Sequence, residues 1–72
     1  MENTTTSRTY KCYNAFNPDP EGIIVFKGDT LELIEHLDGG EMLLEIINGY
    51  QEGMQFELEA FTASKHFENI SN

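Results

Sequence analysis

Three glycine-containing turn signals divide the middle of this chain into short apolar segments and constrain its fold more than any other feature. They are Lys27-Gly28-Asp29, Asp38-Gly39-Gly40 and Asn48-Gly49. Glycine adopts the positive φ angles of tight turns, and Asn-Gly is the typical signal of a two-residue type I′ hairpin. The segments between the turns are rich in Leu and Ile, which favours β-strands. The sequence therefore predicts a meander of short strands.

The rest of the chain fits around this meander as a single domain at residues 9–70, after a polar, flexible tail at 1–8. The predicted elements are a strand at 9–16, a loop at 17–22, strands at 23–26, 30–36, 41–47 and 50–58, a short helix or 3-10 turn near 59–66, and a last strand at 67–70. Pro18 and Pro20 lack N–H donors, so we expect no ladder through the loop. Ile34 directly follows Leu33, which indicates a bulge or a strand covered on both faces.

The charge of the chain is strongly negative. Among its 72 residues, 13 are acidic and 4 are basic, which gives a formal net charge of −9. Binding to nucleic acid or to an anionic membrane needs Lys or Arg, so neither is an expected partner. A basic protein would be attracted. The alternative is that the charge only keeps the domain soluble.

Cysteine usage and hydropathy indicate a compartment. Cys12 is the single cysteine, so no internal disulfide forms, and a reducing, cytoplasmic location is expected. We interpret Cys12 as a small apolar core residue. No apolar run approaches the ~20 residues of a membrane span, and no signal peptide is recognised.

The order of the signals resembles the SH3 family of small β-barrels. Residues 12–16 (Cys-Tyr-Asn-Ala-Phe) stand where that family has its opening strand, and 17–22 where it has a long acidic loop. Residues 26–31 (Phe-Lys-Gly-Asp-Thr-Leu) match its diverging turn, and 63–70 resemble its one-turn helix and last strand. The resemblance implies a mainly β, five- to six-stranded SH3-like barrel. Similar compact acidic barrels occur among small bacterial and bacteriophage proteins, and by analogy we expect such a source.

The residues that would bind a ligand in this family are not retained. Eukaryotic SH3 domains hold proline-rich peptides between aromatic ridges that include paired tryptophans. This chain has no Trp, and Glu41 and Met42 stand in that position. Ala63 and His66 stand where the family has a proline and a tyrosine. The resemblance therefore implies the barrel and not the polyproline ligand.

Catalytic and metal chemistry have little support in the sequence. Cys12, His36 and His66 lie far apart without the spacing of a metal site. The acidic residues of 19–29 lack a calcium-loop pattern. No nucleophile motif or phosphate-binding glycine loop is present, so we expect no enzyme, cofactor or metal.

Binding remains as the expected activity, and six apolar or aromatic residues are its candidates. The aromatics are those that a thin core need not hold, and the two aliphatic residues lie opposite Met42 and Leu44 in the predicted strand 41–47. The predicted protein-binding surface consists of Tyr10, Tyr13, Phe16, Leu43, Ile47 and Tyr50. Packing of two or more of the aromatics inside the barrel is the alternative, as is covering of Leu43 and Ile47 by the helical segment.

We therefore expect a small, acidic, non-enzymatic protein-interaction domain, whose partner is another protein, basic or a second copy of the chain. The alternative is an acidic inhibitor or nucleic-acid mimic that targets the basic groove of a DNA- or RNA-handling protein. That alternative requires carboxylates to line one face, and its candidates are Glu32, Glu35, Glu41, Glu45, Glu57 and Glu59. Nucleic-acid binding through a barrel face fits the fold but not the charge.

Overall fold

The computed structural model describes residues 8–19 and 22–70, and it is mainly β with one helical turn, as predicted. Over these residues seven strands form two sheets. The elements are β1 (Thr9–Cys12), β2 (Phe16–Asp19), β3 (Ile23–Val25), β4 (Thr30–His36), the 3-10 turn η1 (Asp38–Gly40), β5 (Glu41–Asn48), β6 (Gln55–Glu59), α1 (Ala60–Ala63) and β7 (Phe67–Asn69). Of the predicted tail at 1–8, only Arg8 belongs to the described residues, and its carbonyl accepts a hydrogen bond from Leu33 N–H.

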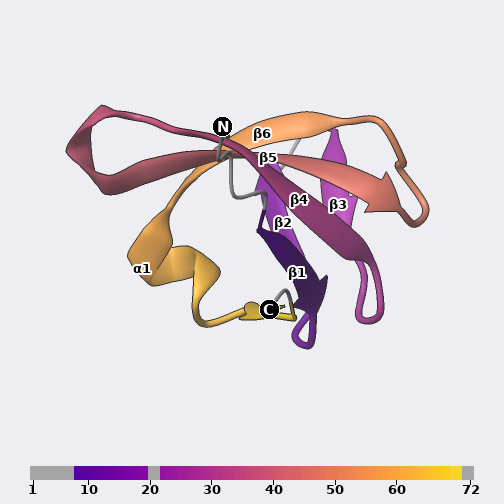
Figure 1. Ribbon diagram of the computed structural model, residues 1–72. Helices are drawn as coiled ribbons and strands as arrows, with labels where there is room; N and C mark the ends of the chain where they lie inside the picture. Colours follow the sequence, from indigo (N-terminus) through magenta and orange to yellow (C-terminus); the bar gives the residue numbers. More distant parts are fainter. Residues whose placement is uncertain (1–7, 20–21, 71–72) are drawn as a thin grey trace, which may run out of the picture.

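The larger sheet has five antiparallel strands in the order β6-β5-β4-β1-β7. β4, β5 and β6 follow one another as hairpins, whereas β1 and β7 come from distant parts of the chain (Figure 1). The one-turn helix α1 links β6, at one edge of the sheet, to β7 at the other. β2 and β3 form a separate antiparallel pair.

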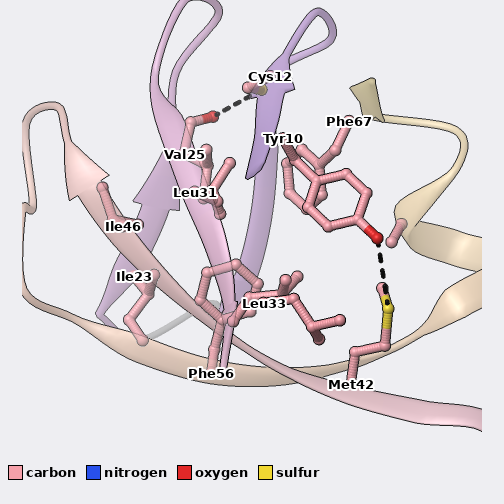
Figure 2. Close-up of a cluster of buried hydrophobic side chains, with 12 residues drawn as sticks. Tyr10, Cys12, Ile23, Val25, Leu31, Leu33, Met42, Ile46, Phe56 and Phe67 are labelled. Carbon is pink, nitrogen blue, oxygen red and sulfur yellow. Dashed lines mark hydrogen bonds between the residues drawn. The ribbon is translucent and has the colours of Figure 1, made fainter. Parts of the chain in front are cut away.

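The two-residue alternation of the long β4–β5 hairpin builds the core. Met42, Leu44 and Ile46 of β5 are buried, and so are Leu31 and Leu33 of β4. Because successive side chains of a strand point to opposite faces, both strands direct these residues to one side of the sheet. Figure 2 shows them gathered with side chains from the other elements. The remaining members of the core are Tyr10, Cys12, Ile23, Val25, Phe56, Ala63 and Phe67.

The predicted bulge at Ile34 is present. The register of β4 against β5 shifts between Leu33 and Glu35, and the Ile34 side chain is exposed. The extra residue lets β4 continue beyond the core without burying Glu35. β4 therefore continues beyond its pairing with β1, alongside β5, whose own pairing with β6 reaches Glu41↔Glu59.

The prediction of one strand at 9–16 followed by an unpaired loop is wrong. The chain bends at residues 13–15, and β2 then pairs with β3 through Phe16↔Val25 and Asp19↔Ile23. Pro18 is accommodated because β2 is an edge strand whose register shifts between Phe16 and Asp19. This pair raises the number of strands above the five or six expected. Pro20 and Glu21 of the predicted loop lie outside the described residues.

The predicted two-residue turn at Asn48-Gly49 is also wrong. Asn48 still belongs to β5 and pairs with Thr30, and the chain reverses over residues 49–54 instead. Gly53 N–H donates to the Ile46 carbonyl and closes this longer connection. Gly53 supplies the positive φ angle of 97° that the reversal needs.

The Lys27-Gly28-Asp29 turn is held by Asp29, the one charged residue that is buried in the described part of the chain. Its Oδ2 accepts the Phe26 N–H at 2.9 Å, and its own N–H donates to the Phe26 carbonyl at 3.0 Å. Two further hydrogen bonds join the turn to β1: Cys12 N–H donates to the Asp29 carbonyl, and Gly28 N–H donates to the Cys12 carbonyl. Gly28 has a φ of 99°, which favours glycine at this position.

Gly49 lies directly against the Asp29 carboxylate. A Cβ atom at this position would be 2.5 Å from Asp29 Cγ and 2.7 Å from both carboxylate oxygens. The absence of a side chain at Gly49 therefore lets the 49–54 connection pack onto the turn before β4.

We predict that Gly49→Ala lowers the free energy of unfolding by about 1–3 kcal/mol, because the added methyl group overlaps a buried carboxylate. In an Asp29→Ala background the same substitution will cost less, since the overlap is gone. Urea denaturation of the four proteins measures the difference. Gly53→Ala is the matched control: no atom lies within 4 Å of its Cβ, so its cost should be equal in both backgrounds. An equal cost of Gly49→Ala in both backgrounds would contradict this contact.

Candidate functional site

The face of the five-stranded sheet that points away from the core collects glutamates. In β5 the inward side chains of Met42 and Leu44 alternate with Glu41, Leu43 and Glu45, which lie on the opposite face. Residues paired across an antiparallel ladder share a face, so the register extends this set to β4 and β6. We call this surface the acidic sheet face; the register assigns to it Glu32, Glu35, Glu41, Leu43, Glu45, Glu57 and Glu59, and we include the exposed Ile47, which lies at the register shift between Leu31 and Thr30.

The ladder places like charges directly opposite one another on the acidic sheet face. Glu32 pairs with Glu45 across β4 and β5, and Glu41 pairs with Glu59 across β5 and β6. Directly opposed like charges destabilise a sheet by several tenths of a kcal/mol per pair. Gln55, opposite Glu45, donates a hydrogen bond from its Nε2 to Glu45 Oε1 at 3.0 Å, so we expect a cost in stability from the pairing of Glu41 with Glu59.

Leu43 and Ile47 provide apolar surface within the acidic sheet face. Leu43 is half-buried, and its ladder partners are Glu35 on β4 and Glu57 on β6. Ile47 is 37% exposed. The helix α1 directs Ala63 into the core, so it packs on the other side of the sheet and leaves both residues uncovered. The ladder thus places Leu43 on the acidic sheet face, and the exposed Ile47 adjoins it at the register shift next to Leu31.

Tyr13 and Phe16 lie together in a second place, against the segment that follows α1. The Tyr13 hydroxyl donates to the Ser64 carbonyl at 2.6 Å, and Tyr13 N–H donates to the His66 carbonyl. The centroids of the Phe16 and His66 rings are 4.3 Å apart, and His66 Nδ1 donates to the Asn14 carbonyl at 3.0 Å. These contacts join the bend after β1 to the end of the chain. Tyr13 remains 47% exposed, whereas Phe16 is half-buried.

Tyr50 lies in a third place, on the connection between β5 and β6. Its ring meets Phe26 edge-on, with 5.6 Å between ring centroids, and it is 76% exposed. The neighbouring Gln51 fixes the connection, because its side chain accepts a hydrogen bond from Ile24 N–H and donates one to the Gly22 carbonyl. The predicted surface is therefore divided among three sites.

Tyr10 is a core residue, so the expectation that it lies outside the core is wrong. It is 9% exposed, and its hydroxyl points to the Met42 sulfur at 4.0 Å (Figure 2). The sequence contains a signal for this burial. Tyr10 lies two residues before the buried Cys12, so both side chains point to the same face of β1.

Two exposed aromatic rings were not among the sequence candidates. Phe26 is 43% exposed beside Tyr50, and Phe61 on α1 is 71% exposed with Lys65 Nζ 4.4 Å above its ring. The three-residue spacing of Phe61 from Leu58 does not reveal this exposure, because Leu58 belongs to β6 and α1 begins only at Ala60. Phe26 gives no signal either, because its exposure depends on the path of the chain into the turn.

Among the described residues, the side chains that could act in catalysis or bind a metal lie apart from one another. Cys12 is buried, and burial raises the pKa of its thiol above the usual value of 9.0; the negative charge of Asp29 adds to this rise and a backbone hydrogen bond at Asn14 opposes it. In the described part of the chain, no three or more His, Cys, Asp or Glu side chains form a group suited to a metal ion. Within the same residues, no helix has the length and apolar character needed to cross a membrane.

Comparisons of the chain with protein-family models, with curated proteins and with solved structures find no match.

We predict that Glu59→Gln stabilises the protein by about 0.2–1 kcal/mol at low ionic strength, because it removes the repulsion from Glu41. The gain should shrink in high salt, since exposed charges are screened. Thermal or urea unfolding at two salt concentrations measures both effects. Glu52→Gln, an exposed substitution in the 49–54 connection, is the control. A destabilised Glu59→Gln protein would contradict the assigned register.

We predict that Cys12 makes the protein less stable as pH rises above about 9. Because the pKa of the folded thiol is raised, the unfolded thiol ionises first, so the unfolded state is favoured in alkaline solution. In Cys12→Ala this part of the pH dependence is absent. Urea denaturation of both proteins at about pH 8 and about pH 10 tests it. Identical slopes against pH would show that the thiol is not desolvated.

Proposed function

We propose that this chain is a non-enzymatic protein-interaction domain that binds a basic protein through the acidic sheet face. The observation that carries the proposal is the collection of six glutamates around Leu43 and Ile47 on one side of a single sheet. A face with a few apolar side chains and a charged rim has the composition of a protein interface.

The energetics of the face also support a binding role. We expect that keeping Glu41 opposite Glu59 costs stability in a domain of only 72 residues. Residues that act in binding are often retained at such a cost. A partner that supplies Lys or Arg would neutralise the repulsion on binding and would be attracted over a longer range at low salt.

We also propose that the scaffold is SH3-like. The order of the elements resembles that of the SH3 family: an opening strand, a glycine-containing turn before β4, two hairpins, one helical turn and a last strand beside β1. Glu41 and Met42, in the place of the family's tryptophans, belong to the acidic sheet face and the core. The proposed ligand is therefore a basic surface and not a polyproline helix. A cytoplasmic location belongs to the same proposal, since Cys12 is a buried, single thiol.

A second candidate function is that of an inhibitor that mimics nucleic acid. The observation in its favour is that all six glutamates expected for such a role lie on the acidic sheet face. Along a strand, side chains on one face recur every ~6.8 Å, which is about two steps of the 3.4 Å rise of a DNA strand. In this case the basic partner would be a protein that itself binds DNA or RNA.

We predict that affinity capture with the protein recovers a basic protein, and that Leu43→Ser combined with Glu57→Gln weakens the complex at least about ten-fold. The reason is that both changes fall on the acidic sheet face. Titration calorimetry with the captured protein measures the affinity. Ile70→Ser combined with Glu52→Gln makes the same chemical changes at exposed residues elsewhere and should leave the affinity unchanged.

The two candidate functions differ in one further measurement. A mimic will displace nucleic acid from the captured protein, whereas an ordinary interaction domain will bind without displacing it. Equal loss of affinity in both double variants, or no captured protein at all, would contradict the role of the acidic sheet face.

A further inference from the structure

β6 is the terminal strand of the five-stranded sheet, and among the described residues it forms a ladder on one side only. Its ladder partner is β5. β2 also contacts β6, but β2 forms its ladder with β3. Over residues 8–19 and 22–70, no strand forms a ladder with the other side of β6. Such an edge is a template for a further strand.

The register identifies the backbone groups at this edge. Ile46 N–H donates to the Met54 carbonyl, and Leu44 pairs with Phe56 two residues further along. In an antiparallel ladder, residues alternate between those that bond to the partner and those that face away. Phe56 and Leu58 therefore bond to β5, whereas Gln55, Glu57 and Glu59 direct their N–H and C=O groups outward.

The same alternation determines which side chains of β6 an added strand would contact. Glu57 and Glu59 lie on the acidic sheet face, and Leu58, half-buried, lies on the core side. A strand that carries basic side chains on one face and apolar side chains on the other would match both. A second copy of β6 would instead place Glu57 and Glu59 against further glutamates. Charge complementarity thus favours a basic strand and disfavours self-association.

We propose that β6 binds an extended peptide segment of its partner by antiparallel strand addition, with Lys or Arg alternating with apolar residues. This inference rests on the proposed function, which it deepens by defining the partner's chemistry and backbone conformation. In the added strand, each basic residue lies opposite Gln55, Glu57 or Glu59 and exchanges backbone hydrogen bonds with it. The apolar residues between them cover Leu58.

A short peptide that alternates lysine and valine, capped at both ends, tests the proposal. In the antiparallel register, the lysine N–H groups face β6 and the valine N–H groups face solvent. Methylation of the lysine amides should weaken binding at least about ten-fold, since several hydrogen bonds are lost. Methylation of the valine amides should leave the affinity unchanged. Binding of the parent peptide should also slow hydrogen exchange at the amides of Gln55 and Glu57.

Protein variants separate strand addition from general charge attraction. Glu57→Lys combined with Glu59→Lys should lose the peptide, whereas Asp38→Lys combined with Glu52→Lys changes the net charge equally at exposed turn residues and should retain it. Equal binding of both methylated peptides would overturn strand addition and leave the acidic sheet face as a binding surface. Failure of the parent peptide to bind, or equal loss in the two variants, would also overturn it.

Discussion

The register between β4 and β5 determines which side chains enter the core and which face solvent. It places Leu33 opposite Leu44 on the core side and Glu32 opposite Glu45 on the other. A slip by one residue would exchange the two faces and bury carboxylates. One ladder therefore produces both the hydrophobic core and the acidic sheet face. The bulge at Ile34 and the closing bond from Gly53 N–H to the Ile46 carbonyl confine the register at either end of β5.

Asp29 connects this hairpin to the remainder of the chain. Its carboxylate holds the turn before β4, its carbonyl accepts Cys12 N–H from β1, and Gly49 of the β5–β6 connection packs against it. A turn, a strand and a connection are thus positioned by one buried residue, through its side chain and its backbone carbonyl. The outward glutamates lie outside the core, and we expect the repulsion between Glu41 and Glu59 to weaken the sheet, which is why we assign them to binding.

Short-range sequence patterns predicted the features that follow from the residues of a single segment, such as the alternation of apolar and polar side chains. The bounds of β4, the inward residues of β5 and the helical turn after β6 all follow from short-range signals. The pairing of β2 with β3 through Pro18 could not be predicted, because it depends on an edge position that only the tertiary fold creates. The long connection after Asn48 depends on the contact of Gly49 with Asp29. For the same reason the candidate site was predicted in parts: Leu43 and Ile47 were identified, whereas the gathering of glutamates around them required the register of three strands.

Nuclear Overhauser contacts between α protons measure the register of β4, β5 and β6, because they do not depend on side chains. We expect strong contacts between the α protons of Leu33 and Leu44 and between those of Leu43 and Glu57, which are pairs without mutual backbone hydrogen bonds. These contacts would place the glutamates of three strands on one face. A pattern displaced by one residue in either ladder would contradict this register, since the glutamates would then be divided between the core side and solvent.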